Sequence, residues 1–283
     1  MRIMVTGASG GYGHYAINYL QNFAPAGTEI YGLVRSQEKA DKLSASGVMP
    51  RIADYGDLES LVAAFAGIDR LLFVSVPNTA LQRNIVKAIE QSEISYVAYT
   101  SLYGLDHEKF GLEQNHRTTE KMISQLKVRH TFLRNNWYLE IAAPQLKAAV
   151  KTGKFDYLSE NGMLAWALKR EYAEAGARVI LSDQYGEVLN LVGKPVTYPD
   201  LASAVARATG KQIKTELVSP QGLMNSLSAS GLSSMDVQLS YLYQDYARKG
   251  NNGEAQADLT EFEKVLGHSL TSLPEAVKEV INE

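Results

Sequence analysis

The segment VTGASGGYGHYAINYL, residues 5–20, joins the end of an apolar run to a helix-like stretch through three glycines, Gly7, Gly10 and Gly13. After the last glycine, aromatic residues recur at a spacing of four, which is typical of a helix with one apolar face. The apolar run before the first glycine is short enough to be a buried strand. This segment therefore predicts a strand, a tight turn and a helix.

The same alternation continues along the first half of the chain. Each further apolar run is separated from the next by a stretch with helical periodicity, and such alternation predicts a parallel sheet covered by helices on both faces. The runs are EIYGLVR (29–35), MPRIADY (49–55), DRLLFVSV (69–76), SYVAYTSL (95–102) and RHTFLR (129–134). We therefore expect an α/β fold with a doubly wound parallel sheet of the Rossmann type in residues 1–137.

The alternation loosens after Trp137, and we expect residues 138–283 to form a smaller C-terminal α/β lobe that receives the substrate. A strand within residues 186–195 is expected to return to the main sheet. Residues 219–258 are rich in Ser, Gly, Asn and Gln, and we expect this stretch to be partly mobile.

Composition excludes several classes of chemistry. The 283-residue chain has no cysteine, so it has neither disulfides nor a cysteine nucleophile, and its five histidines show no metal-ligand spacing. A net charge of −3 provides no broad basic field for nucleic acid. No apolar signal segment follows Met1, and the longest apolar run is too short to span a bilayer. We expect a cytoplasmic protein without a membrane partner; the fold type is compatible with a homodimer.

The glycine turn has the features of a phosphate-binding site. Gly7 permits the tight turn, Gly10 allows the backbone to approach a pyrophosphate, and Gly13 lets the helix pack closely on the sheet. The helix N-terminus adds unpaired N–H groups and the positive end of its dipole. A glycine triplet can also mark a bare turn, but its place after the first strand of an α/β alternation favours a dinucleotide. The other turn residues in this predicted site are Ser9, Gly11 and Tyr12.

The end of the second strand indicates which dinucleotide is preferred. An acidic residue there would hold a ribose 2′-hydroxyl, but the chain has Arg35 at that position and no carboxylate until Glu38. A guanidinium matches the geometry of a 2′-phosphate, although a solvated arginine at a strand end is also common. We therefore expect NADP(H) as the cofactor.

Two further strand ends supply cofactor candidates. Asp54 ends the third strand, where its carboxylate can accept a hydrogen bond from the adenine amino group. A helix-capping role is the alternative for this region, with Asp57 as the competing cap. Ser75 and Val76 close the fourth strand at the carboxyl edge, where ligands of such sheets bind.

An ordered set of segments resembles the NmrA-like atypical short-chain dehydrogenases, and among them the bacterial NAD(P)H quinone oxidoreductase type. The segments are TGASGGYG, LVRSQEKA, ADYGD, YVAYTSL, TEKM, LRNNWYLE and YAEAGARVI. The resemblance extends over nearly the whole chain. It implies a Rossmann core, a preference for NADP(H), and hydride transfer to a small quinone-like or other conjugated acceptor.

The chain departs from the wider superfamily at its catalytic pair. Ordinary short-chain dehydrogenases carry a tyrosine and a lysine four residues apart; Lys121 resembles that lysine, but Arg117 stands where the tyrosine is expected. Ketone or sugar chemistry needs that proton donor, whereas quinone oxygens can take protons from solvent. The departure thus argues against an epimerase. It is compatible with a quinone reductase and also with a non-catalytic NADP(H) sensor.

The segment LRNNWYLE follows the sixth strand at the same edge. Asn135, Asn136, Trp137 and Tyr138 are the expected substrate-binding residues, with flat aromatic rings beside a planar acceptor. The alternative is that the two aromatic residues pack the junction with the smaller lobe. The expected catalytic residues are Lys121 and Tyr138.

The last cofactor candidate rests on the resemblance. Arg170 is similar in placement to a family arginine near the cofactor. An ion pair with Glu174, one helical turn further on, is the alternative. Thr100 and Ser101 lie where the superfamily keeps an active-site hydroxyl.

Overall fold

The computed structural model describes residues 1–283 as two compact units. The first unit contains Met1–Asn135, Arg170–Leu191 and Thr260–His268. The second contains Asn136–Lys169, Val192–Leu259 and Ser269–Glu283. The chain therefore leaves the first unit two residues before the expected boundary at residue 137, and it returns there twice.

The first unit contains one parallel sheet of seven strands in the order β10-β6-β5-β4-β1-β2-β3. The strands are β1 (Arg2–Val5), β2 (Glu29–Val34), β3 (Met49–Ile52), β4 (Arg70–Phe73), β5 (Tyr96–Leu102), β6 (Arg129–Asn135) and β10 (Val188–Leu191). Each expected apolar run forms a strand, and the strand expected within residues 186–195 pairs with β6. The doubly wound α/β class is confirmed.

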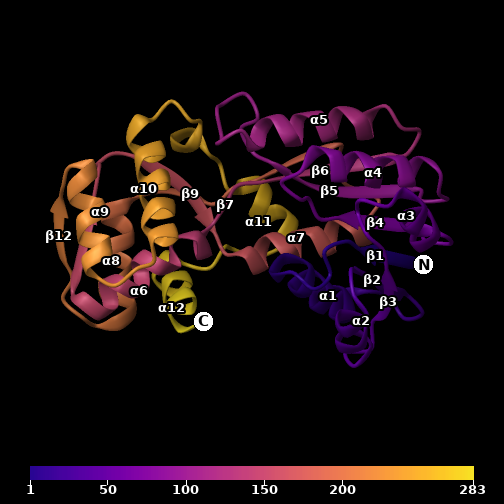
Figure 1. Ribbon diagram of the computed structural model, residues 1–283, viewed down its shortest axis with the longest axis horizontal. Coiled ribbons are helices and arrows are strands. Elements are labelled where there is room, and N and C mark those ends of the chain that lie inside the picture. Colours follow the sequence, from indigo (N-terminus) through magenta and orange to yellow (C-terminus); the bar gives the residue numbers. More distant parts are fainter. The chain divides into compact units, whose positions relative to one another are not determined.

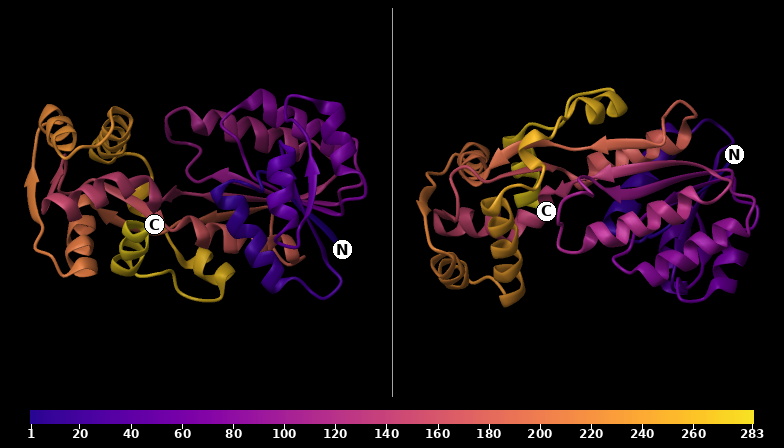
Figure 2. Two further views of the ribbon diagram at one scale, coloured as in Figure 1. Left: turned by 60° about the horizontal axis from the view of Figure 1, so that its bottom comes forward. Right: turned by 90° about the horizontal axis from the view of Figure 1, so that it is seen from above.

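Helices lie on both faces of this sheet (Figures 1 and 2). α3, α4 and α5 share one face, and α1, α2 and α7 share the other (Figure 1). The helices of this unit are α1 (Gly11–Phe23), α2 (Gln37–Ser44), α3 (Leu58–Phe65), α4 (Thr79–Glu90), α5 (Leu112–Ser124), α7 (Lys169–Leu181) and α11 (Thr260–Leu266). An apolar core lies between the sheet and α3–α5, and it includes Phe65, Phe73 and Tyr99.

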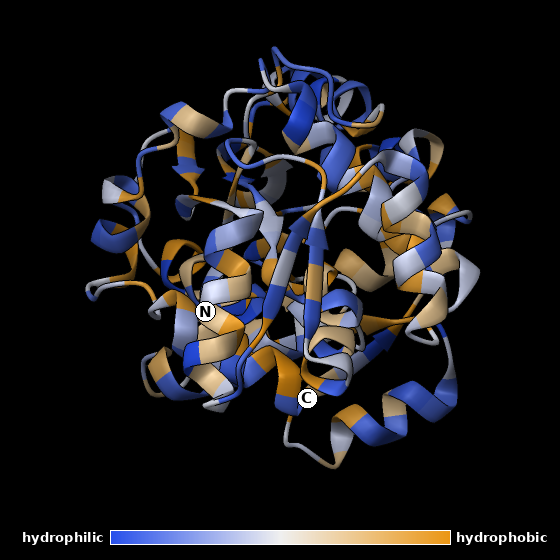
Figure 3. Cartoon of the chain, turned by 90° about the vertical axis from the view of Figure 1, so that its left-hand side faces the viewer, coloured by the Kyte–Doolittle hydropathy of each residue, from blue (hydrophilic) through white to orange (hydrophobic).

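Short polar side chains begin several of these helices. Ser36 caps α2, Asp57 caps α3 and Asn78 caps α4, each by accepting hydrogen bonds from backbone N–H groups of the first turn. The buried residues of α4 recur at intervals of three and four, as in an amphipathic helix. Hydrophobic and hydrophilic residues also alternate along the helices that face the viewer in Figure 3. Caps and periodicity together explain why the sequence pattern locates these helices correctly.

The second unit combines small sheets with helices. Its strands are β7 (Trp137–Tyr138), β9 (Met163–Ala167) and β11 (Lys194–Thr197) in one sheet, and β8 (Lys154–Tyr157) with β12 (Lys214–Leu217) in another. Its helices are η1 (Leu139–Ala142), α6 (Ala143–Thr152), α8 (Tyr198–Thr209), α9 (Pro220–Ala229), α10 (Ser234–Lys249), η2 (Glu254–Gln256) and α12 (Leu273–Asn282). Most of the polar stretch 219–258 is thus helical, because Ser219 and Ser233 cap α9 and α10.

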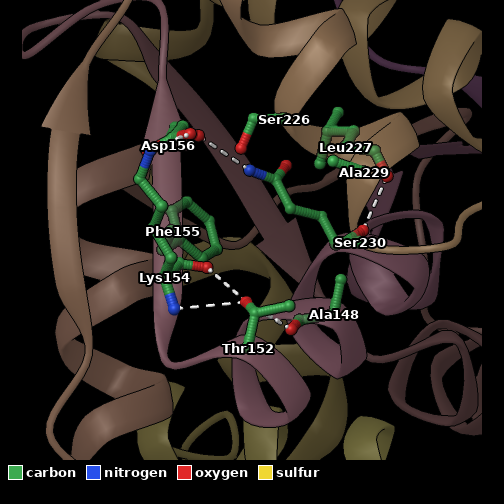
Figure 4. A pocket seen from close by; sticks show the side chains of 10 residues that line it. Ala148, Thr152, Lys154, Phe155, Asp156, Ser226, Leu227, Ala229 and Ser230 are labelled. Atoms are coloured by element: carbon green, nitrogen blue, oxygen red, sulfur yellow. Dashed lines mark hydrogen bonds and ion pairs between the residues drawn. The ribbon is translucent and has the colours of Figure 1, made fainter.

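A groove of about 400 Å³ lies between α6, β8 and α9 within the second unit (Figure 4). Small side chains line its walls, and the Nζ atom of Lys154 lies 3.0 Å from an oxygen of the buried Asp156 carboxylate. No helix of the chain combines the length and apolar character needed to cross a membrane.

Candidate functional site: the carboxyl edge of the parallel sheet

The strand order reverses between β1 and β4. From β1 the chain proceeds outward through β2 and β3, whereas β4, β5 and β6 extend the sheet in the opposite direction. Ligands of doubly wound sheets bind at such a reversal, outside the carboxyl ends of the strands. The two segments that flank the reversal are the β1–α1 turn and the β4–α4 segment.

The β1–α1 turn requires glycine at defined positions. Gly7 has a φ of +60°, a conformation that side chains disfavour. A Cβ atom at Gly13 would overlap the carbonyl oxygen of Gly7 and lie 2.9 Å from the Cα of Ala8. The amide of Gly10 donates to the Gly7 carbonyl over 2.9 Å, which closes the turn. The start of α1 consequently packs against the turn as closely as backbone atoms allow.

The open side of this turn fits an anionic group. Ser9, Gly10 and Gly11 are exposed, and the first turn of α1 carries no acidic residue. The first amides of a helix have no partners within the helix, so they are available to phosphate oxygens. Tyr12 is buried, and its hydroxyl donates to the carbonyl of Tyr172 over 3.0 Å. Its side chain thus packs the start of α1 against α7.

Tyr55 is a turn residue that the sequence analysis did not identify. Its hydroxyl accepts a hydrogen bond of 2.8 Å from the amide of Gly7. Burial raises the pKa of Tyr55, whereas the bond from Gly7 acts in the opposite direction. Tyr55 therefore occupies one amide of the turn and fixes its position. The only sequence signal was its place at the end of the third apolar run, in ADYGD.

The next two strand ends carry the expected charged residues. Arg35 follows β2, is exposed, and makes no ion pair or side-chain hydrogen bond, so its guanidinium is available for a phosphate. Asp54 follows β3 and is also exposed, and its Oδ1 accepts a 2.7 Å bond from the amide of Gly56. Asp57, the expected competitor, is the α3 cap.

Ser75 and Val76 lie in the β4–α4 segment and are held by side chains from neighbouring elements. The amide of Ser75 donates to Thr100 Oγ1 over 2.8 Å, and that hydroxyl donates to Ser75 Oγ over 3.1 Å. Ser101, on the opposite face of β5, donates to Glu120. Both hydroxyls of β5 at the expected active-site position are therefore engaged within the protein.

α5 places the expected catalytic lysine on its solvent face. Lys121 is exposed in the last turn, while His116, Thr119 and Glu120 form the face against the sheet. Arg117, at the position of the missing tyrosine, donates to the carbonyl of Leu105. This position therefore anchors the β5–α5 loop.

The β5–α5 loop buries a lysine that the sequence analysis missed. Lys109 is fully buried, and its Nζ atom lies 5.6 Å from the centre of the Tyr103 ring. Its amide donates to Glu113 over 2.8 Å, and Phe110 next to it has a φ of +59°. The length of this polar loop was the only signal in the sequence, since loops of this length are often functional.

Asn135 ends β6 at the same edge of the sheet. Its side chain is 3% exposed, and neither its amide nitrogen nor its amide oxygen has a hydrogen-bond partner. Buried polar groups are nearly always bonded, and each exception needs an explanation. A ligand carrying a donor and an acceptor would satisfy this amide.

Asn136 and Trp137 belong to the second unit, where the buried carboxylate of Glu254 holds both. The amide nitrogen of Asn136 donates to Glu254 over 2.6 Å and to the carbonyl of Ala165 over 3.0 Å. Trp137 Nε1 donates to Glu254 over 2.9 Å, and its ring meets that of Tyr243 edge-on at 5.1 Å. Trp137 is 3% exposed and is packed within the second unit.

Tyr138 and Arg170 belong to different units of the structure. Tyr138 is half-buried in the second unit, with the Nζ atom of Lys169 5.8 Å from its ring centre. Arg170 belongs to the first unit and lies beside the hydroxyl of Tyr19 on α1, two turns beyond the glycine turn. Glu174, the alternative ion-pair partner of Arg170, forms an ion pair with Arg178, with 2.8 Å between Glu174 Oε1 and Arg178 Nη2.

Comparisons with known proteins agree with this architecture. A model of the NmrA-like family matches residues 1–279. Quinone oxidoreductase 2 of Escherichia coli K12 is 34% identical over 286 aligned positions, covering 99% of both chains. A triphenylmethane reductase from Citrobacter has a TM-score of 0.89 at 31% identity, covering 100% of both chains. An NADPH-dependent quinone oxidoreductase of Escherichia coli, crystallised with NADPH, has a TM-score of 0.83 at 33% identity, covering 99% of this chain and 100% of its own.

These matches extend over nearly the whole length of the chain. They include both the parallel sheet with its glycine turn and the second unit. The chain therefore belongs to the NmrA-like family.

Proposed function

We propose that this protein is an NADP(H)-dependent oxidoreductase whose acceptor is a small quinone-like molecule. Relatives that cover its full length include a quinone oxidoreductase and a triphenylmethane reductase. The observation that carries the proposal is the β1–α1 turn, because a side chain at Gly13 would collide with the turn while the open side presents exposed backbone. When bound, NADPH supplies the hydride.

The residues of the first unit divide the work of holding this cofactor. The β1–α1 turn and the start of α1 receive the pyrophosphate. The first amides of α1 have no partners within the helix, and the positive end of the helix dipole lies there. Arg35 receives the 2′-phosphate, for which its unpaired guanidinium is suited. Ser75 and Val76 form the wall on the other side of the strand reversal. We do not include Lys121, which lies on the solvent face of α5.

Asn135 is our candidate for contact with the acceptor. Its amide can donate to a quinone oxygen, and no group of the protein competes for that donor. A donor fixed where negative charge develops lowers the barrier to reduction. Because Thr100 and Ser101 are engaged elsewhere, we expect solvent to supply the protons. The donors of Asn136 and Trp137 are committed to Glu254, so we assign neither to the acceptor.

The test is to mix the protein with NADPH or NADH and a panel of quinones, following the nicotinamide absorbance. We expect oxidation of NADPH in preference to NADH. Arg35→Ala should weaken NADPH binding about ten- to a hundredfold while leaving NADH binding nearly unchanged, since it removes charge-assisted hydrogen bonds to one phosphate. Lys42→Ala is the matched control, because Lys42 carries the same charge on α2 but pairs with Glu38.

Two outcomes would contradict the proposal. An unaltered preference for NADPH in Arg35→Ala would refute the assignment of the 2′-phosphate to this residue. NADPH binding without consumption across the whole panel would favour the alternative function, a cofactor sensor, which the lack of a tyrosine at position 117 also allows.

A further inference from the structure

A cluster of polar side chains is buried between β5, α4 and α5 in the first unit. Gln82, Tyr99 and Thr119 are fully buried, and Asn115 and His116 are each 8% exposed. Polar groups in such a place stabilise a fold only when every one is bonded. The hydrogen bonds of this cluster extend to the backbone of Val76 in the β4–α4 segment.

Asn115 connects the cluster to the β4–α4 segment. Its Nδ2 donates to the carbonyl of Val76 over 3.0 Å. Its Oδ1 accepts from Thr79 Oγ1 at 2.8 Å and from Gln82 Nε2 at 3.0 Å. The amide of Asn115 is thus oriented by two donors, so that its nitrogen faces the backbone of Val76.

Gln82 completes the arrangement from α4. Its Oε1 accepts from the amide of Val76 at 3.3 Å and from the hydroxyl of Tyr99 at 3.1 Å. Its Nε2 also donates to Thr119 Oγ1 over 2.9 Å. Both backbone polar groups of Val76 are therefore held by side chains, in a segment that has no secondary structure of its own.

A cluster with a purely structural role would not need hydrogen bonds to the backbone of Val76. Apolar side chains of the same shape fill a core at least as well as a bonded polar set. The gain from this polar set is a defined backbone conformation for Val76, beside the strand reversal where a ligand of this fold binds. Thr100 fixes the preceding residue, Ser75, from β5. Two consecutive residues of the wall are thereby held by three different elements.

We infer that Asn115 and Gln82 are positioning residues for the cofactor. They hold Val76, next to Ser75, in the conformation that contacts NADP(H), so that binding does not have to order this part of the segment. The inference rests on the proposed function. It assigns to α5 a role in cofactor affinity through Asn115, two residues before Arg117.

The test compares three variants in the full-length protein. Asn115→Leu removes every bond of this amide, and Asn115→Asp keeps its shape but cannot donate to Val76. Thr119→Val is the matched control, because Thr119 bonds Gln82 and the Asn115 carbonyl but makes no bond to Val76. Deuterium exchange of residues 74–79, the Kd for NADPH, and kcat with a quinone at saturating NADPH are measured for each.

For both Asn115 variants we expect exchange of residues 74–79 to quicken at least tenfold and the Kd for NADPH to rise about tenfold. kcat at saturation should change less than twofold. Thr119→Val should lower the Tm while changing exchange and Kd less than twofold. A lower Tm with unchanged Kd in the Asn115 variants would overturn the inference and leave a structural role only.

The exchange measurement separates this inference from the proposed function. If the wild-type protein fails to bind NADPH, the proposed function falls. Exchange without cofactor then still decides the positioning role, because unchanged exchange of residues 74–79 in the Asn115 variants would refute it.

Discussion

Asn135 and Asn136 are neighbours of the same residue type with nearly equal burial, at 3% and 4% exposure. The amide of Asn135, at the end of the first unit, has no partner at either atom. The amide nitrogen of Asn136, at the start of the second unit, makes two bonds, and one of them is to the Glu254 carboxylate. Burial therefore does not distinguish these residues, whereas the use of their donors does.

The difference indicates what each residue contributes. A buried amide without partners is a cost to folding, and it persists where another constraint maintains it. A buried amide bonded to a carboxylate offsets the cost of burying that charge. We therefore attribute Asn135 to ligand binding and Asn136 to the stability of the second unit.

The largest effect is expected for Asn136→Leu. This change removes a bond to the buried Glu254 carboxylate and leaves the Ala165 carbonyl without its donor. We expect the free energy of unfolding to fall by about 3 to 4 kcal/mol, the sum of one charge-assisted and one neutral hydrogen bond. Urea denaturation measures this value. A loss below about 1 kcal/mol would remove the distinction between the two asparagines.

His116 is a titrating group buried in the first unit. Burial lowers the pKa of His116 to about 4, although the charge of Glu120 acts in the opposite direction. Between about pH 6.5 and 4 the unfolded chain binds a proton at this histidine that the folded protein does not, so stability falls as the pH falls. The loss over this window is roughly 3 kcal/mol.

His116→Gln isolates this contribution. The variant cannot take up the proton, so its free energy of unfolding should fall less steeply than that of the wild type between pH 7 and pH 4. The carboxylates titrate in both proteins, so their contribution cancels when the free energy of unfolding of the variant is subtracted from that of the wild type. Parallel curves for the two proteins would show that His116 is protonated in the folded state as readily as in the unfolded chain.

The smallest effect on stability is expected for Asn135→Leu. Since no bond is lost, the free energy of unfolding should stay constant or rise by about 1 kcal/mol. Quinone reduction should nevertheless slow about tenfold, equivalent to about 1.4 kcal/mol, because a donor to the acceptor is gone. Urea denaturation and steady-state kinetics test the two parts. A destabilised variant with normal turnover would reverse our assignment.

Much of the first unit could be predicted from local patterns. The strand runs, the caps Ser36 and Asp57, and the spacing of Gly7, Gly10 and Gly13 each express a short-range requirement of the backbone. These requirements act over a few residues, so the sequence displays them directly. The order of elements, and with it the fold class, followed from the same patterns.

The roles of side chains at the sheet edge could not be predicted in this way. Lys121 matched a spacing, but the orientation of α5 places it in solvent. Trp137 has a ring suited to stacking, but its indole nitrogen donates a hydrogen bond to Glu254, which is more than a hundred residues away in the sequence. Each of these outcomes depends on a partner that is distant in the sequence.

The sequence by itself determined the α/β class, the glycine turn and the place of Arg35, because backbone geometry and periodicity are local properties. Only the tertiary structure decided which polar side chains remain open to a ligand. Asn135 and Asn136 cannot be told apart in the sequence, because what separates them is the set of donors and acceptors that folding brings around each. The role of a buried polar group depends on its hydrogen-bond partners, and folding brings those partners together from distant parts of the sequence.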